Sequence, residues 1–215
     1  MNFFKFGVSI ASVLLLTSTV ALADSAVDTI INMGTTQAFT DEAVSDDDLN
    51  TILQAGLSAP SAINQQPWHF VAITNKEIIQ EIKDAGSSFA PPAGGNAPSA
   101  PAPASGSAKA ALGDSPAAII IYMDKSTPSP DPDFDCGLAA ENMAVAAASL
   151  GYGVKIVSSP TMTLNGDNHD SLCEKLGVDS SLQAVAVLLI GKKDTDVVSN
   201  ATTRSPMEEK VTIIH

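Results

Sequence analysis

Apolar residues recur along most of the chain at the spacings of regular secondary structure. Between residues 49 and 57 they stand at i, i+3, i+4 and i+8, which places them on one face of a helix. Ser45 and three acidic residues precede this run, as is typical of a helix start, and Pro60 ends it. The same reasoning predicts further helices at 25–33, 76–85, 134–150 and 170–176.

The helix predicted at 134–150 differs from the others in having almost no polar side. Its residues are mainly alanine and larger apolar types, whereas an amphipathic helix carries a distinct polar stripe. Small side chains also let a neighbouring helix approach closely. We therefore expect this helix to be buried all round.

Shorter apolar runs predict strands. The run at 117–123 holds three consecutive isoleucines and no polar alternation, which indicates a central strand covered on both faces. Similar runs predict strands at 70–74, 154–158, 184–190 and 211–214. Helices and strands in this order predict an α+β or α/β fold with a covered sheet. The last strand follows a long polar stretch, so two pairings are open: with its own chain or with a second subunit.

Residues 86–113 interrupt this alternation. They are almost entirely alanine, proline, glycine and serine. Such a composition buries too little apolar surface to offset the entropy lost on ordering. We interpret the segment as a flexible surface insertion within one domain, not as a domain boundary.

The N-terminus has the features of a targeting signal. Lys5 precedes an uninterrupted run of apolar and small residues at 7–20, and the sequence ALA at 21–23 is the small-x-small pattern that signal peptidase reads. The run is shorter than the ~20 residues of a membrane-spanning helix, which favours cleavage over a membrane anchor. We therefore predict a signal peptide at 1–23 and a secreted or periplasmic domain at 24–215, without membrane attachment after cleavage.

Charge and composition exclude several classes of function. The chain has 11 basic and 24 acidic residues and a formal net charge of −13. Nucleic-acid binding requires clustered cations, and the only arginine is Arg204, so we expect no nucleic-acid partner. No histidine stands at metal-ligand spacing from cysteines or carboxylates, so no metal site is expected. Cys136 and Cys173 leave open whether they form a disulfide or remain free thiols.

The densest group of polar residues lies in the sequence APSAINQQPWHF at 59–70. Pro60 begins a stiff turn that carries the hydroxyl of Ser61 and the amides of Asn64 and Gln66. Uncharged donors and acceptors on such a turn suit the edge of a flat heteroaromatic ring. The alternative is structural: the proline ends a helix, the amides satisfy the local backbone and the tryptophan fills the core.

This motif resembles the signature of the nitroreductase family, a group of FMN-dependent oxidoreductases. DCGLAAENM at 135–143 and LGYG at 150–153 are similar to the start and end of the family's central helix. RSPMEE at 204–209 resembles the segment before the family's C-terminal strand. The resemblance implies a three-layer α+β fold, with a mainly antiparallel sheet flanked by helices. It also implies a homodimer that exchanges the C-terminal strand, with flavin at the subunit interface.

The resemblance further implies which residues bind the cofactor. Where the family has a basic motif, this chain has MGTTQAF at 33–39, which keeps a hydroxyl at Thr35 but no cation. We therefore expect weak FMN binding with Arg204 as the main phosphate anchor. The implied cofactor-binding residues are Thr35, Gln37, Pro60, Ser61, Asn64, Gln66, Gly151, Gly153 and Arg204. No catalytic residue is assigned, because the protein in such enzymes positions and tunes the ring.

The implied function is electron transfer through FMN. The donor would be a reduced compound such as NAD(P)H, and the acceptor a nitroaromatic, a quinone or a similar small molecule. Free NAD(P)H is not expected outside the cytoplasm, so the donor stays open. The missing cations favour one alternative, a non-catalytic secreted protein that binds flavin or another planar ligand.

Overall fold

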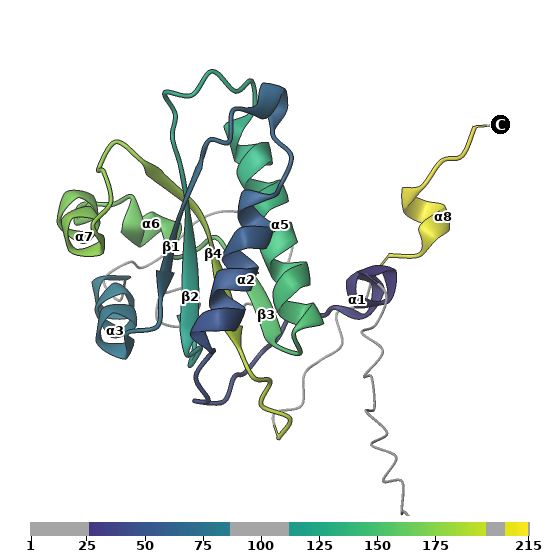
Figure 1. The fold of residues 1–215 in the computed structure, drawn as a ribbon, viewed down its shortest axis with the longest axis horizontal. Helices are drawn as coiled ribbons and strands as arrows, with labels where there is room; N and C mark the ends of the chain where they lie inside the picture. Colours follow the sequence, from purple (N-terminus) through teal and green to yellow (C-terminus); the bar gives the residue numbers. More distant parts are fainter. Residues whose placement is uncertain (1–25, 87–111, 197–204, 215) are drawn as a thin grey trace, which may run out of the picture.

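The computed structural model describes residues 26–86, 112–196 and 205–214, which form three layers (Figure 1). Helices α2 (Asp46–Leu57) and α5 (Pro132–Ser149) pack on one face of a sheet. Helices α3 (Lys76–Ala85), α6 (Thr161–Leu164) and α7 (His169–Leu176) cover the other face. The predicted α+β class with helices on both sides of the sheet is therefore confirmed.

The sheet has four strands in the described part of the chain: β1 (Trp68–Ile73), β2 (Ala117–Met123), β3 (Gly153–Val157) and β4 (Gln183–Gly191). Their order is β1-β2-β4-β3, and every neighbouring pair is antiparallel. Every residue of β2 is buried, as the unbroken apolar run predicts. Ile119 and Ile121 face α2 and α5, whereas Ile120 and Tyr122 face the opposite helix layer.

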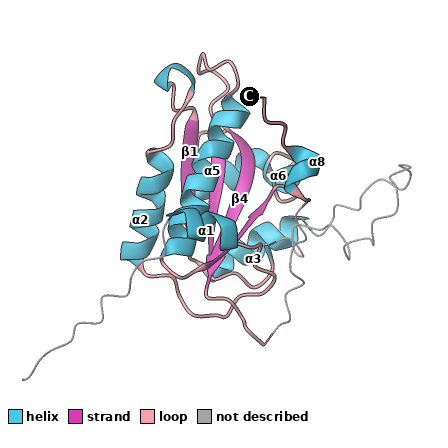
Figure 2. Cartoon of the chain, turned by 90° about the vertical axis from the view of Figure 1, so that its right-hand side faces the viewer, coloured by secondary structure: helices cyan, strands magenta, loops and turns pink. Residues whose placement is uncertain are grey.

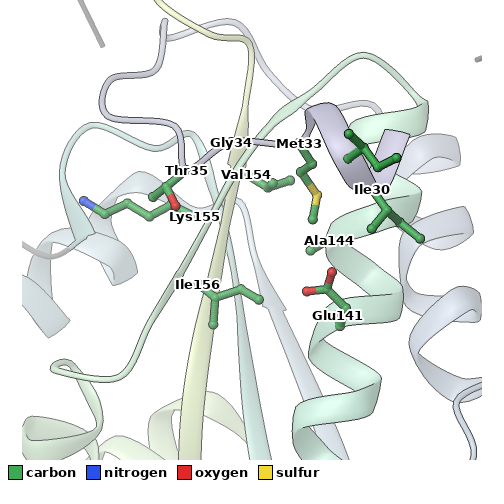
Figure 3. A pocket seen from close by; sticks show the side chains of 10 residues that line it. Ile30, Met33, Gly34, Thr35, Glu141, Ala144, Val154, Lys155 and Ile156 are labelled. Atoms are coloured by element: carbon green, nitrogen blue, oxygen red, sulfur yellow. The ribbon is translucent and has the colours of Figure 1, made fainter. Parts of the chain in front are cut away.

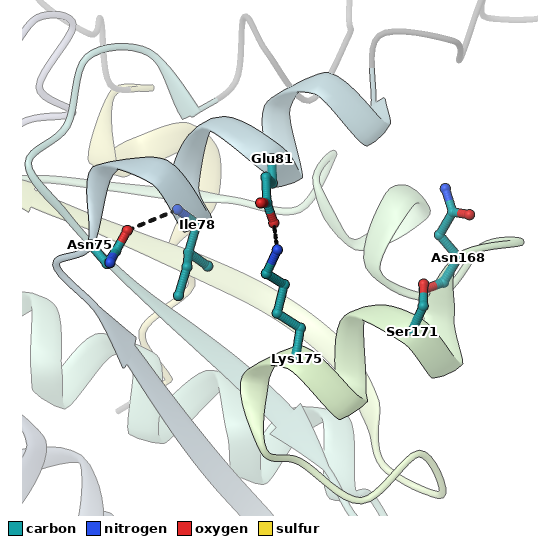
Figure 4. A network of polar contacts seen from close by, with 6 residues as sticks. All are labelled: Asn75, Ile78, Glu81, Asn168, Ser171 and Lys175. Atoms are coloured by element: carbon teal, nitrogen blue, oxygen red, sulfur yellow. Dashed lines mark hydrogen bonds and ion pairs between the residues drawn. The ribbon is translucent and has the colours of Figure 1, made fainter.

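The predicted starts of α2 and α3 are confirmed by their capping contacts. Ser45 Oγ accepts a hydrogen bond from Asp48 N at 3.1 Å, and Asn75 Oδ1 accepts one from Ile78 N at 3.0 Å (Figure 4). The helix predicted at 25–33 is α1 (Ala26–Asn32), which lies across α5 (Figure 2). In the opposite layer, Lys175 of α7 forms an ion pair with Glu81 of α3 (Figure 4).

The prediction that the long helix is buried all round is wrong for the chain on its own. Helix α5 starts two residues earlier than expected, and its outer side is open at Phe134, Gly137 and Glu141. The sheet, α2 and α1 cover only part of its circumference. An apolar pattern indicates that a face is covered, but it does not say by which chain.

The C-terminal segment also differs from its prediction. A short helix, α8 (Met207–Lys210), interrupts the polar stretch, and residues 211–214 follow it in no strand of the described chain. Figure 1 shows this end of the chain standing apart from the sheet. The side chains of Val211, Ile213 and Ile214 are exposed. Pairing within the same chain is therefore wrong, and pairing with a second subunit stays a prediction.

Cys136 and Cys173 are both free thiols. Cys136 belongs to the core between the sheet and α5, whereas Cys173 belongs to the core on the opposite face. The sheet separates them, so the disulfide alternative does not hold within this chain. The predicted signal peptide at 1–23 and residues 87–111 of the predicted insertion lie outside the described residues, as does Arg204.

Candidate functional site

The polar motif between α2 and β1 folds into a strained turn. It contains the 3-10 turn η1 (Ala62–Asn64). Ile63, Asn64 and Gln66 have φ angles of +46°, +57° and +48°, and they are the only non-glycine residues with positive φ in the described chain. Such conformations cost roughly 1–3 kcal/mol each and persist only where surrounding contacts enforce them. Their concentration in one turn marks it as a candidate site.

The contacts that enforce this turn come from Ser61 and from a distant carboxylate. Ser61 Oγ accepts a hydrogen bond from Gln66 N at 2.9 Å. Asp135, in the first turn of α5, accepts one from Ala62 N at 3.0 Å and another from Ser129 Oγ at 2.6 Å. Asp135 is only 2% exposed, and a buried carboxylate is stable only when such donors satisfy it. The turn is therefore fastened to α5.

The turn presents its polar side chains to solvent. Gln66 Nε2 donates to Asn64 Oδ1 at 3.0 Å, and both residues are exposed, as is Pro60. Trp68 differs, because it is buried and its ring stacks on Phe70 with centroids 6.2 Å apart. The structural interpretation thus holds for the tryptophan, whereas the amides stay available to a ligand.

A second group of predicted residues lies along the free edge of β3. Thr35 forms a parallel bridge with Val154, and Gln37 Nε2 donates to Thr35 O at 3.2 Å. The anchor of this segment is the next residue, Thr36. Its N donates to Val154 O at 2.8 Å, and its Oγ1 accepts from Val154 N at 2.9 Å. Thr36 is buried, whereas Thr35 and Gln37 are exposed.

The two predicted glycines have different explanations within the chain: backbone conformation for Gly151 and close packing for Gly153. Gly151 has φ +82° just after α5, a conformation that favours glycine at helix ends. A Cβ on Gly153 would lie 2.6 Å from Thr36 Oγ1 and 2.7 Å from Lys193 Cγ. Gly151 therefore lets the chain turn after α5, and Gly153 lets the start of β3 pack tightly against the segment that carries Thr35.

Tyr152, between these glycines, ties the same region to the start of α2. Its hydroxyl donates to Asp48 Oδ2 at 2.7 Å, and Lys192 Nζ lies 4.3 Å from its ring centroid. This hydrogen bond lowers the pKa of the Asp48 carboxyl, with Ser45 adding to the effect, and it raises the pKa of Tyr152. The interactions fix the position of the α5–β3 connection.

A cavity of about 490 Å³ lies between α1, α5 and β3, beside Thr35 (Figure 3). Its wall combines apolar side chains with polar groups, and the carboxylate of Glu141 points into it (Figure 3). Binding sites for small ligands commonly have volumes in this range. The lining residues are Ile30, Ile31, Met33, Gly34, Thr35, Glu141, Ala144, Val154, Lys155 and Ile156.

The structure does not bring all the predicted residues together within one chain. Ala62 contacts the first turn of α5, whereas Gly151 directly follows the end of that helix. An 18-residue helix is roughly 27 Å long at 1.5 Å per residue. The polar turn at 60–66 and the group around Thr35 therefore stand at opposite ends of α5.

Sequence reasoning missed Asp135 and Thr36 as the residues that hold the two groups in place. In the sequence, both residues belong to motifs, but nothing there indicates which residues they contact. Ala62, which donates to Asp135, precedes it by 73 residues. Among the described residues, no cluster of His, Cys, Asp and Glu is placed to hold a metal ion. None of the described helices is long and apolar enough to cross a membrane.

Comparisons with known proteins agree with the geometry. Residues 34–192 match the model of the nitroreductase family. A protein of Archaeoglobus fulgidus, named as a candidate NADH dehydrogenase/NAD(P)H nitroreductase, is 28% identical over 159 residues, which are 72% of this chain and 78% of that protein.

Solved structures share the fold. A nitroreductase with bound FMN from Bacteroides fragilis has a TM-score of 0.75 at 23% identity, covering 89% of this chain and all of that one. A nitroreductase with bound FMN from Desulfitobacterium hafniense has a TM-score of 0.72 at 23% identity, covering 88% of this chain and 98% of that one.

Proposed function

Because the chain belongs to the nitroreductase family, we propose that it is an FMN-dependent oxidoreductase that transfers electrons to a small aromatic acceptor. The acceptor class is nitroaromatics, quinones and similar molecules, and the donor is a reduced compound such as NAD(P)H. The observation that carries the proposal is the strained turn, which is fastened by Asp135 and presents Asn64 and Gln66 to solvent. The name of the Archaeoglobus fulgidus relative supports the choice of donor.

The ring end of the site fits a flavin. The amides of Asn64 and Gln66 and the hydroxyl of Ser61 offer the uncharged donors and acceptors that the carbonyls and nitrogens of the ring edge require. When bound, FMN would supply the hydride and electron transfer. The residues of the chain hold the ring, orient it and exclude water.

The phosphate end fits less tightly, because Thr35 and Gln37 carry no charge. We propose Arg204, which lies outside the described residues, as the main cation for the phosphate. Glu141 adds a carboxylate to the cavity wall. These features favour weak FMN binding, and they keep the second candidate, a non-catalytic binder of flavin or another planar ligand, open to test.

We further propose that the complete site forms in a homodimer. Two copies that pack with their α5 helices antiparallel would place the turn of one copy beside the cavity of the other. The open outer side of α5 and the exposed Val27, Ile30 and Ile31 of α1 support this arrangement, because large exposed apolar surfaces mark interfaces. Residues 211–214, extended and exposed, are the segment proposed to cross to the partner.

The mature protein, purified from cells that export it, tests these proposals together. Intact mass should give an N-terminus at Asp24 and place the protein in the periplasm or medium. The visible absorption band of a bound flavin is the expected cofactor signature, and light scattering should give a dimer. A protein that lacks residues 205–215 should lose dimerisation and flavin together, whereas a flavin-loaded monomer would contradict the dimeric site.

Anaerobic reduction separates the enzyme from the non-catalytic alternative. Bound flavin should lose its visible band on addition of NADH, NADPH or dithionite and regain it when 4-nitrobenzoate or benzoquinone is added. Flavin that binds but is reoxidised by neither acceptor would favour the binding protein. Reduction by dithionite alone would retain the oxidoreductase and exclude the nicotinamide donor.

A further inference from the structure

His169 begins α7, on the face of the sheet opposite α2 and α5 (Figure 1). Its Nδ1 lies 2.6 Å from Leu164 O, at the end of α6, and its Nε2 lies 2.9 Å from Ser180 O, in the turn before β4. A carbonyl oxygen only accepts hydrogen bonds, and only the protonated imidazole has an N–H on both nitrogens. The two contacts together therefore require the imidazolium form of His169.

The contact with Ser180 holds a turn that has few other attachments. Residues 179–182 form this turn between α7 and β4. Two of its hydrogen bonds stay within the turn: Ser181 N donates to Asp179 Oδ1 at 2.8 Å, and Leu182 N donates to Asp179 O at 3.1 Å. Within the described part of the chain, Ser180 O is thus the point at which a hydrogen bond ties the turn to another element.

The same turn covers a buried thiol. Leu182 packs against the core cluster that contains Cys173, which is 1% exposed. Cys173 Sγ lies 3.7 Å from each ring nitrogen of His169. Tyr122 belongs to this cluster as well, but its buried hydroxyl has no hydrogen-bond partner among the described residues, so it adds no hydrogen bond to hold the region together. Burial raises the pKa of Cys173, which keeps the covered thiol unreactive.

We propose that protonation of His169 controls access to Cys173: the imidazolium holds the turn at 179–182 over the thiol, and the neutral ring releases it. The neutral imidazole keeps one N–H and faces the other carbonyl with a lone pair, so repulsion replaces attraction there. We expect the proton to stay at the shorter contact, with Leu164 O, and the contact with Ser180 O to be lost. A cavity of about 230 Å³ beside the ring gives the released turn room to move.

The groups around the ring set the direction of the pH dependence. The two carbonyls raise the pKa of His169, and the neighbouring carboxylate of Asp170 adds to this effect. Lys125 lines the cavity from just after β2, and Asp179 lies in the turn itself, whereas α6 carries no titratable residue. Histidine is the side chain that ordinarily changes charge between about pH 5 and 8. The turn should therefore be held fully below about pH 6.5 and released as the pH rises through the raised value.

Alkylation of the native protein tests this proposal, with Cys136 as an internal control. Cys136 is also 1% exposed, and burial raises its pKa to about 12, but it lies on the other face of the sheet from Cys173. Iodoacetamide is applied from roughly pH 5.5 to 9, and mass spectrometry of the peptides gives the two alkylation rates separately. Dividing the Cys173 rate by the Cys136 rate removes the general effect of pH on thiol chemistry.

The ratio of the two rates should rise by about tenfold or more above about pH 6.5 and level off beyond the raised pKa of His169. His169→Gln carries no charge at any pH, so its ratio should stay high and no longer depend on pH. His69→Gln is the matched control, because His69 is exposed on β1, and its ratio should follow the wild type. Thermal unfolding checks that each variant is folded.

Three outcomes would overturn the proposal. A wild-type ratio that stays constant with pH would do so whether or not His169→Gln folds. Equal acceleration of both thiols would show that the whole chain loosens instead of the turn. A pH-dependent ratio that persists in His169→Gln would assign the opening to another group. The measurement needs no flavin, so protein that binds no flavin would refute the proposed function and leave this result intact.

Discussion

Replacing Asp135 by alanine tests whether a buried carboxylate holds the turn in its strained form. The change leaves Ala62 N and Ser129 Oγ without the acceptor that they now contact at 3.0 and 2.6 Å. Hydrogen bonds to charged groups contribute about 1.5–3 kcal/mol each, and removing the carboxylate also removes the cost of burying it. We therefore expect Asp135→Ala to lower the free energy of unfolding by about 2–4 kcal/mol, or the Tm by roughly 5–15 °C.

Urea unfolding followed by tryptophan fluorescence measures this loss. The chain has a single tryptophan, Trp68, which lies at the start of β1 directly after the turn and is buried. Flavin affinity, titrated well below the Tm of the variant, should fall by about tenfold, because the ligand must then also order the turn. The stability of Asp135→Asn should lie between those of the wild type and Asp135→Ala, since the amide oxygen of the asparagine still accepts a hydrogen bond from Ala62 N.

Two controls make the result specific. Asp133→Ala removes an exposed carboxylate from the same helical turn, and it should cost only the ~0.3–1 kcal/mol of an acidic residue at a helix start. Ser129→Ala removes one of the two donors and should lower stability by less than Asp135→Ala. If Asp135→Ala unfolds within about 0.5 kcal/mol of the wild type, the turn is not held by this carboxylate and the reasoning fails.

Three further predictions concern other contacts. Gly153→Ala should lower stability by about 1–3 kcal/mol because its Cβ would overlap Thr36 and Lys193, and thermal unfolding of the variant checks this. The ring nitrogens of His169 lie 2.6 Å from Leu164 O and 2.9 Å from Ser180 O, which raises the His169 pKa. Its stabilising effect should thus be full below about pH 6.5 and lost as the pH rises through the raised value, so unfolding of wild type and His169→Gln should differ more at low pH than at high pH. Arg204→Ala should weaken FMN about tenfold and riboflavin hardly at all, whereas Asn64→Ala should weaken both, and equal losses on removing Arg204 would show that it does not hold the phosphate.

Local signals in the sequence predicted most of the elements correctly. Asn75 begins a helix because its side chain satisfies a free backbone N–H, and β2 is buried on both faces because its residues are apolar without alternation. Both features depend on residues that are close together in the chain, so the sequence alone predicts them. The motif that begins at Pro60 was likewise predicted as a stiff polar turn.

Contacts between distant residues were not predictable in the same way. Ala62, next to the strained Ile63, donates a hydrogen bond to Asp135, which comes near only because α5 packs beside the turn. Thr36, and not its neighbour Thr35, proved to be the anchor on β3, because alternate residues of an extended segment point to opposite sides. The open side of α5 shows a further limit, since an apolar pattern does not distinguish cover by the same chain from cover by a partner.

Each half of the proposed site is held in place by its own chain before any association. Asp135 fastens the turn, and the hydrogen bonds of Thr36 to Val154 fasten the segment with Thr35. Assembly of two copies therefore requires no refolding of either half. Most of the conformational entropy of the two halves is already lost when the single chain folds. In the proposed dimer, a flavin that contacts both halves would bind the dimer and not the single chain, and mass action would link the two equilibria. Flavin would then strengthen the proposed dimer by the same factor by which dimerisation strengthens flavin binding.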